Sequence, residues 1–118
     1  MTEPAVIAQV SPTELQRRLE GGERLVVLDV REPDERDYCL IRLPASATDL
    51  HIPMGDVQGQ LQVIQAAASG SVVVYCHLGM RSMVVARWLA ARGVQGVQNL
   101  EGGIDAWSAQ VDPEVARY

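Results

Sequence analysis

The sequence predicts an α/β fold in which a mainly parallel sheet of five strands is covered by helices on both faces, and three observations lead to this prediction. Short apolar runs typical of buried strands alternate along the chain with segments of helical spacing. No repeat, low-complexity segment or interdomain linker interrupts this alternation. The length of 118 residues allows one domain with one core, so residues 1–118 are expected to form a single domain.

The chain begins with an expected strand that is followed by a capped helix. Val6–Val10 is short and largely apolar, which favours a strand. Ser11 is expected to cap the helix, because Pro12 suits the first helical position and Glu14 follows where a capping box needs an acidic residue. The helix is expected to run to about Leu19, before two glycines that end it.

The next segment contains a buried strand, a short helix and a less regular stretch. Leu25–Leu28 consists of apolar residues and predicts a buried strand. A short helix is expected over Asp34–Leu40. Prolines and a glycine interrupt residues 41–56, so only a short strand near Asp49–Ile52 is expected there.

The second half of the chain repeats the alternation of helices and strands. Helical spacing of apolar residues predicts a helix over Val57–Ala68. The apolar run Val72–Tyr75 predicts a buried strand, and a helix is expected from Ser82 to about Ala91. A strand over Val97–Leu100 and a helix over Ile104–Gln110 complete the expected elements.

Composition and charge exclude several classes of protein. Apolar residues make up 47% and charged residues 21% of the chain, which is typical of a globular protein and argues against disorder. The net charge of −5 and the lack of a basic run argue against nucleic-acid and membrane partners. No apolar stretch approaches the roughly 20 residues that span a bilayer.

Cysteine usage and the N-terminal residues predict a compartment. Met1–Ala5 lacks the basic and apolar regions that begin a secretory signal. Cys39 and Cys76 lie far apart in unlike contexts, which does not suggest a disulfide framework. We therefore expect a cytoplasmic protein with reduced thiols, and nothing in the pattern requires more than a monomer.

The turn after the strand Val72–Tyr75 indicates the function most directly. Cys76 stands at the carboxyl end of this strand, where parallel α/β sheets bind their ligands. A helix is expected to begin a few residues later, with the positive end of its dipole near the thiol. We call residues 76–81 the Cys76 loop. Its other members are His77, Leu78, Gly79, Met80 and Arg81.

Three neighbours of Cys76 favour the thiolate that nucleophilic chemistry requires. Gly79 permits positive φ, so that successive N–H groups can converge on the sulfur as an anion-binding nest. Arg81 supplies a cation, and Ser82 is expected to cap the following helix. We interpret the turn as a nucleophilic cysteine site. The alternative is that Cys76 is a small buried side chain at the end of a strand.

A second strand also ends in polar residues. Asp29 and Arg31 follow Leu25–Leu28, and the carboxyl ends of parallel strands meet at one edge of a sheet. We expect these two residues to form an ion pair at that rim, or to bind loop amides, and so to support the Cys76 loop. The acidic run Glu32–Glu35 is interpreted as a solvated helix start.

These motifs resemble the single-domain rhodanese family, whose members are thiosulfate sulfurtransferase-like. The sequence Cys-His-Leu-Gly-Met-Arg-Ser at 76–82 is similar to that family's active-site loop. Leu28–Glu32, His51–Pro53 and Asn99–Trp107 are similar to other family signatures, so the resemblance covers nearly the whole chain. Cys39–Pro44 departs from the Gly-His-Ile-Pro-Gly of many members, and resembles domains attached to sulfur-carrier activating enzymes.

The resemblance implies a rhodanese-like three-layer α/β/α sandwich and covalent sulfur transfer without a metal or organic cofactor. Cys76 would take the outer sulfur of thiosulfate or of a persulfide donor and hold it as a persulfide, stabilised by the amides of His77 to Arg81. Cyanide, a small thiol, a protein thiol or a sulfur carrier would accept the sulfur. Because Leu78 and Met80 are uncharged, a protein partner and modest thiosulfate activity are expected.

Two alternatives to a sulfurtransferase remain at this point. Cysteine phosphatases have five residues between the cysteine and the arginine of their loop, whereas four separate Cys76 from Arg81. A shorter ring of amides suits a sulfur atom better than a tetrahedral phosphate, and no acid is placed to protonate a leaving alcohol. The second alternative is a regulatory or sulfur-relay binding module with slow or no turnover.

A few other residues admit two interpretations. Cys39 is either a resolving thiol or, as its apolar context favours, a buried structural thiol. His77 either tunes the site or is exposed and acts through its backbone amide, which we favour. The cysteines and histidines lack paired ligand spacing, which argues against zinc. Trp88 and Trp107 fall on expected helices and are interpreted as packing residues.

Overall fold

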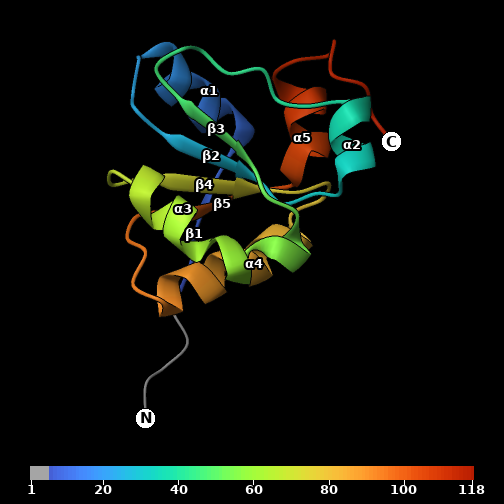
Figure 1. Cartoon of the computed structure of the whole chain (residues 1–118). Helices are drawn as coiled ribbons and strands as arrows, with labels where there is room; N and C mark the ends of the chain where they lie inside the picture. The colour runs from blue at the N-terminus through green and yellow to red at the C-terminus, as the bar shows by residue number, and fades with distance from the viewer. Residues whose placement is uncertain (1–5) are drawn as a thin grey trace.

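The computed structural model describes residues 6–118, so the expectation for Met1–Ala5 lies outside the described residues. The described chain forms one five-stranded sheet with the strand order β1-β5-β4-β2-β3, and every neighbouring pair is parallel (Figure 1). The five expected strands are therefore confirmed, two with the expected bounds and three with bounds shifted by one or two residues. The strands are β1 (Ala8–Val10), β2 (Val26–Asp29), β3 (Thr48–His51), β4 (Val72–Tyr75) and β5 (Val97–Leu100).

Helices cover both faces of the sheet, which confirms the three-layer α/β/α sandwich. In Figure 1, α3 and α4 lie against one face, whereas α1 and α5 lie against the other, with α2 beside α5. Two short 3₁₀ turns connect β3 to α3. The helices are α1 (Pro12–Glu20), α2 (Pro33–Tyr38), α3 (Leu61–Ala67), α4 (Met80–Ala91) and α5 (Gly103–Gln110), and the turns are η1 (Met54–Asp56) and η2 (Gln58–Gln60).

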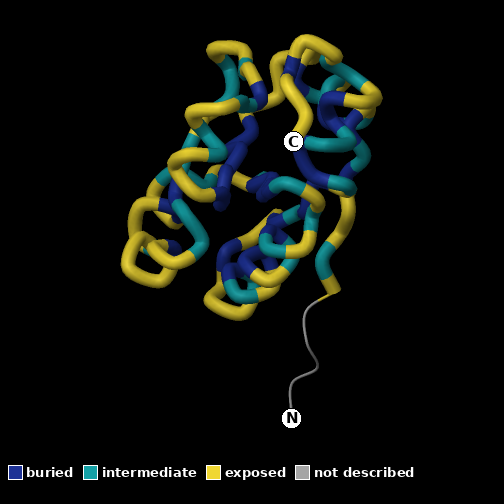
Figure 2. Tube along the Cα trace, turned by 90° about the vertical axis from the view of Figure 1, so that its right-hand side faces the viewer, coloured by how far each residue is buried: buried dark blue, intermediate teal, exposed yellow. Residues whose placement is uncertain are grey.

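Each face of the sheet has its own hydrophobic core. Along β2, Val26 and Leu28 pack towards α3 and α4, whereas Val27 packs towards α1 and α5, as the alternation of a strand requires. The central strands β2, β4 and β5 form the buried middle layer in Figure 2, whereas the edge strands β1 and β3 are largely exposed or half-buried. Cys76 belongs to the core beneath α3 and α4, whereas Cys39 packs against the core on the other face. The two thiols are therefore on opposite sides of the sheet.

The expected helix over Val57–Ala68 is wrong in its first turn. Regular α-helix begins only at Leu61, and η2 precedes it. The Val57 and Gln60 amides bond to carbonyls three residues back, as in a 3₁₀ helix. Gly59 lies in this stretch, and because glycine is a poor helix former it disfavours a continuous α-helix here. The Val57 side chain is buried all the same, which explains why its spacing fits the helical pattern.

The first helix begins as expected. Pro12 occupies its first turn, and the Ser11 hydroxyl accepts a hydrogen bond of 3.1 Å from the Glu14 amide. The Glu14 carboxylate pairs with Arg17 instead of closing a capping box. Among residues 6–118 the longest helix, α4, has 12 residues, and no helix in this range is both long and apolar enough to cross a membrane.

Candidate active site

The two polar strand ends meet at one rim of the sheet. Asp29 at the end of β2 is paired in register with Tyr75 at the end of β4, and the Val30 amide donates to the Tyr75 carbonyl at 3.1 Å. Cys76 directly follows Tyr75, and Arg31 lies two residues after Asp29. The parallel topology therefore brings together the two segments that the sequence singled out for their chemistry.

The Cys76 thiol lies in a cradle of hydrogen-bond donors. Its sulfur accepts hydrogen bonds from the backbone amides of Gly79 at 3.1 Å and Ser82 at 3.4 Å. The Ser82 hydroxyl lies 3.2 Å from the same sulfur. Cys76 is only 1% exposed, so the cradle is shielded from water. Such donors stabilise a negative charge on the sulfur, or on a second sulfur attached to it.

Gly79, and not Ser82, is the cap of α4, which corrects the expectation for Ser82. The φ of 104° at Gly79 turns the chain straight into the helix, which therefore starts at Met80. A side chain is strained at this φ, so glycine is required there. Because the helix starts two residues earlier than expected, Ser82 lies in its first turn. Its amide and hydroxyl both face the thiol.

The start of α5 supports the Cys76 loop from behind, which sequence reasoning missed. A Cβ on Gly103 would lie 2.4 Å from the His77 carbonyl oxygen and 2.6 Å from that of Cys76, so only glycine fits. The Ile104 and Asp105 amides donate to the Cys76 and His77 carbonyls at 2.9 and 3.1 Å. The Gly-Gly sequence before this helix was a visible signal, but its partner lies too far along the chain to infer.

Arg81 points its guanidinium at Glu35 in α2. The Nη1–Oε1 distance is 2.7 Å and the Nη2–Oε2 distance is 2.9 Å, which is a bidentate ion pair. The Arg81 hydrogen bonds hold the pKa of Glu35 down at about 2, and they raise the pKa of Arg81 above its ordinary value. Glu35 is therefore part of the site. The interpretation of Glu32–Glu35 as a solvated helix start is wrong for this residue. No local spacing signals a pair 46 residues apart.

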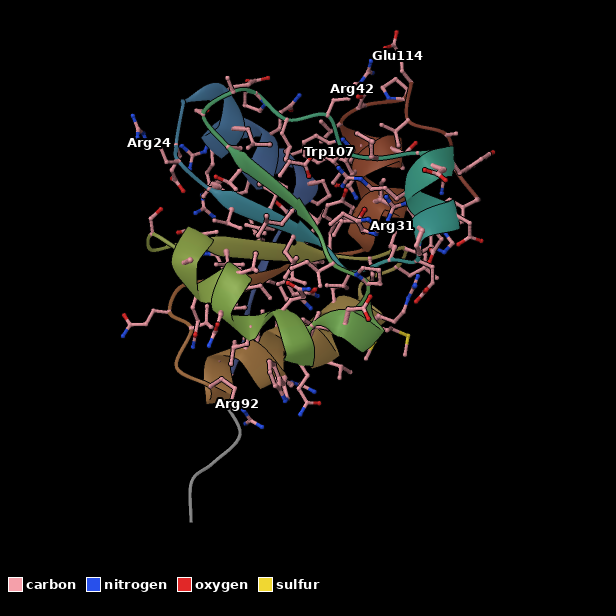
Figure 3. The ribbon with its side chains drawn as sticks, in the orientation of Figure 1. Arg24, Arg31, Arg42, Arg92, Trp107 and Glu114 are labelled. Carbon is pink, nitrogen blue, oxygen red and sulfur yellow. The ribbon has the colours of Figure 1, made fainter. Side chains whose placement is uncertain are left out.

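Asp29 and Arg31 form an ion pair that is fully buried and not exposed at the rim. The carboxylate accepts from Arg31 Nε at 2.9 Å and Nη2 at 2.8 Å, and Arg36 approaches it at 3.3 Å. The Cys39 carbonyl accepts a further bond of 2.7 Å from Arg31. Burial alone would lower the pKa of Arg31, but the hydrogen bonds that it donates to Asp29 and Tyr118 raise this pKa above its ordinary value. Figure 3 shows Arg31 inside the molecule near α2 and α5.

Tyr118 joins the two ion pairs and contacts the Cys76 loop. Its hydroxyl donates to Glu35 Oε2 at 2.6 Å and accepts from Arg31 Nη1 at 3.2 Å. Its ring stacks on His77 with 3.8 Å between centroids and 10° between planes. Burial is the main reason that the pKa of Tyr118 rises to about 12, so the hydroxyl keeps its proton. His77 is thus half-buried under an aromatic ring, whereas the sequence suggested an exposed side chain.

The outer side of the loop is apolar. Leu78 and Met80 are 57% and 79% exposed, and Val84 is exposed one turn further along α4. A groove beside them runs between α4 and the 3₁₀ turns. It is lined by Met54, Val57, Gln58, Val84, Val85 and Trp88.

The remaining candidate residues lie away from this chemistry. Cys39 packs on the opposite face of the sheet from Cys76, with its sulfur 3.6 Å from Arg31 Nη1. Trp107 is buried in the core beneath α1 and α5, and Trp88 packs against the other core. Within residues 6–118, no three side chains of His, Cys, Asp or Glu come together as a metal site.

The fold and the site together define a parallel α/β protein with a cysteine anion loop. The sequence matches the Rhodanese-like domain family over residues 11–110. It is 33% identical over 108 residues to YtwF of Bacillus subtilis, which is named as a candidate sulfurtransferase, and the match covers 92% of this chain and 97% of that protein. The chain belongs to the rhodanese family.

Two further relatives extend the comparison. A rhodanese-like domain protein from Staphylococcus aureus superposes with a TM-score of 0.76 at 25% identity, over 95% of this chain and 99% of that one. The adenylyltransferase and sulfurtransferase MOCS3 of Arabidopsis thaliana is 27% identical over 125 residues, but the match covers 94% of this chain and only 26% of that protein. The sulfurtransferase names of YtwF and MOCS3 support a role in sulfur transfer in general.

Proposed function

We propose that this protein is a sulfurtransferase that carries sulfane sulfur as a persulfide on Cys76. The donor is thiosulfate or a persulfide, and the acceptor is a thiol or, in an assay, cyanide. The observation that supports this most is the cradle around the Cys76 sulfur, in which the amides of Gly79 and Ser82 and the Ser82 hydroxyl converge on one atom. These hydrogen-bond donors stabilise the Cys76 thiolate, and they lie one bond from the outer sulfur that carries the charge of a persulfide.

The proposed reaction has two displacement steps. The Cys76 thiolate attacks the outer sulfur of thiosulfate, a new S–S bond forms, and sulfite leaves with the electron pair of the broken S–S bond. An acceptor nucleophile then attacks the outer sulfur of the Cys76 persulfide, and the thiolate is released unchanged. No external oxidant or reductant is needed.

A second candidate is a relay or regulatory module with slow turnover. The 1% exposure of Cys76 favours slow turnover, because any sulfur donor or acceptor has little access to the sulfur in this conformation. Both candidates place the persulfide on Cys76, and they differ in the rate of turnover. Two free cysteines among the described residues fit a proposed cytoplasmic, reducing setting for either.

Intact-mass spectrometry of the native protein after incubation with thiosulfate tests the proposal. We expect a gain of one sulfur atom, which is about 32 Da and is removed by cyanide as the second step requires. A reactive Cys76 thiolate that takes up no sulfur from thiosulfate or from a persulfide would contradict a sulfurtransferase. An adduct that forms but turns over very slowly would favour the relay module.

We propose a protein as the physiological partner, because the surface around the loop is apolar. Leu78 and Met80 of the loop and Val84 one turn further along α4 are exposed, and Val84 also lines the groove beside α4. Two relatives with this domain carry adenylyltransferase or sulfur-carrier names, which is consistent with a protein acceptor. A protein can cover such a surface, whereas thiosulfate gains nothing from it.

Val84→Ser is expected to weaken transfer to a protein thiol and to spare transfer to cyanide. The substitution removes apolar area from the proposed contact, so kcat/KM with reduced thioredoxin should fall about fivefold, as loss of a partly buried methyl pair predicts. The measurement is kcat/KM with each acceptor. Val63→Ser, a similarly exposed valine on α3, is the matched control and should change neither value. Equal losses with both acceptors in Val84→Ser would contradict the proposal.

A further inference from the structure

The charge of the Cys76 loop is already compensated inside the protein. Arg81 is the only arginine or lysine of the loop, and both of its terminal nitrogens are bound by Glu35. The groups that remain to bind a sulfur donor are the two amides and one hydroxyl of the cradle. Such a loop can hold one negative charge on sulfur, but residues 76–81 offer no free cation for a small dianion.

Glu35 is held in place by more than Arg81. The Glu32 amide donates to its Oε1 at 3.1 Å, as the capping box of α2 requires, and the Tyr118 hydroxyl donates to its Oε2 at 2.6 Å. Because the Arg81 bonds keep the pKa of Glu35 at about 2, the carboxylate stays charged at neutral pH. An incoming anion must therefore compete with a fixed carboxylate for Arg81.

Tyr118 couples this ion pair to the rest of the site. It takes a hydrogen bond from the buried Arg31 and stacks on His77 of the loop, so its hydroxyl is directed at Glu35. The Tyr118 ring thus contacts the loop at His77, and Glu35 binds it at Arg81. The exposed side chains of the loop, Leu78 and Met80, are uncharged.

We propose that Glu35, positioned by Tyr118, is a specificity determinant that selects persulfide donors of low charge over the thiosulfate dianion by neutralising Arg81. The inference rests on the proposed sulfurtransferase function and names its donor class. Thiosulfate carries two negative charges to an anionic thiolate, so it depends on a free cation. A persulfide on a neutral thiol carries at most one negative charge and depends mainly on the amide cradle.

The transfer from such a donor is balanced without a further reactant. The Cys76 thiolate attacks the outer sulfur of R–S–SH, the S–S bond of the donor breaks, and R–S⁻ leaves with its electron pair. One sulfur is transferred, so Cys76 becomes the persulfide Cys–S–SH, which loses its proton to water and is held by the cradle. With thiosulfate the leaving group is sulfite, whose two negative charges call for a cation, and the Arg81 guanidinium is held by Glu35.

The test is the single-turnover rate of Cys76 persulfide formation, followed by intact mass with two donors. These are thiosulfate and the persulfide of N-acetylcysteinamide, a neutral thiol. In Glu35→Gln the thiosulfate rate should rise about five- to tenfold at low salt, because one partly screened charge is freed. The rate with the persulfide should change by less than about twofold, since that donor makes little use of the cation.

Ionic strength separates this role from a merely structural one. In Glu35→Gln the thiosulfate rate should fall steeply as salt is added, whereas in the unaltered protein it should depend on salt only weakly. Asp34→Asn is the matched control, because it removes the same charge from an exposed position of α2. It should leave the ratio of the two rates unchanged. Tyr118→Phe, which removes one bond to Glu35, should shift the ratio in the same direction by about twofold.

The outcomes distinguish this inference from the proposed function. If Glu35→Gln and Tyr118→Phe both leave the ratio and the salt dependence as they are, the specificity role is overturned while sulfur transfer stands. If Glu35→Gln does not fold, the ratio of the two rates in Tyr118→Phe and the salt dependence of the unaltered protein test the specificity role. An unchanged ratio together with a strong salt dependence would overturn it. If neither donor places sulfur on Cys76 of the unaltered protein, the proposed function fails and the inference fails with it.

Discussion

Replacement of Cys76 by serine is expected to abolish sulfur transfer and to leave the fold intact. A serine oxygen cannot form the persulfide that both steps need, so turnover should fall by at least about 10³-fold, as for other lost nucleophiles. The fold should survive because the introduced hydroxyl is smaller than the thiol and polar, and the Gly79 and Ser82 amides that bound the sulfur can bond to it. The measurements are thiosulfate:cyanide turnover and the sulfur adduct by intact mass.

Cys39→Ser is the control for this prediction. Cys39 lies on the opposite face of the sheet, and its sulfur is near Arg31 and not near the cradle. We expect the Cys39→Ser protein to take up one sulfur and to turn over at close to the normal rate. If Cys39→Ser lost activity as completely as Cys76→Ser, a second relay thiol would be required. If Cys76→Ser retained transfer, Cys76 would not be the nucleophile.

Asp29→Asn is expected to cost the protein much of its stability. The substitution keeps the shape of the side chain but leaves the fully buried Arg31 guanidinium without its carboxylate. Breaking one partner of such a pair lowers the free energy of unfolding by about 3–5 kcal/mol, because an uncompensated charge stays buried. Urea unfolding should show a lower midpoint with an unchanged dependence on denaturant.

Two further variants check the cause of this loss. Asp49→Asn removes the more exposed ion pair with Arg36, and should cost no more than about 1 kcal/mol. The double variant Asp29→Asn with Arg31→Met removes both buried charges, and should be less destabilised than Asp29→Asn alone. An Asp29→Asn protein as stable as Asp49→Asn would show that the buried pair contributes little.

Local patterns predicted most of the sheet. β4 appears within the expected bounds because buried parallel strands are short, apolar runs, and β5 does so although Gln98 and Asn99 in it are polar. The helix over Val57–Ala68 was predicted too long, because apolar spacing persists through residues that form 3₁₀ turns. Hydrophobic periodicity reports which side chains are buried. It does not report the backbone hydrogen bonds that distinguish a 3₁₀ turn from an α-helix.

The candidate site was also predicted only in part from the sequence. Cys76 and Gly79 were predicted from the sequence because a strand end, a glycine and a helix start lie within a few residues of each other. The position of the helix start was misplaced, since Gly79 can begin the helix directly and Ser82 then lies in its first turn. The burial of the Asp29–Arg31 pair was not foreseen, because charged residues at strand ends are ordinarily exposed.

The sequence by itself determined the alternation of strands and helices and the short turn that presents Cys76, because both depend on contacts between residues near in the chain. Only the tertiary structure decided that Arg81 is neutralised by Glu35, that Tyr118 stacks on His77, and that Gly103 supports the loop. These partners come from separate segments that the parallel sheet brings to one rim. Their pairing depends on distances in the folded chain, which no spacing along the sequence encodes.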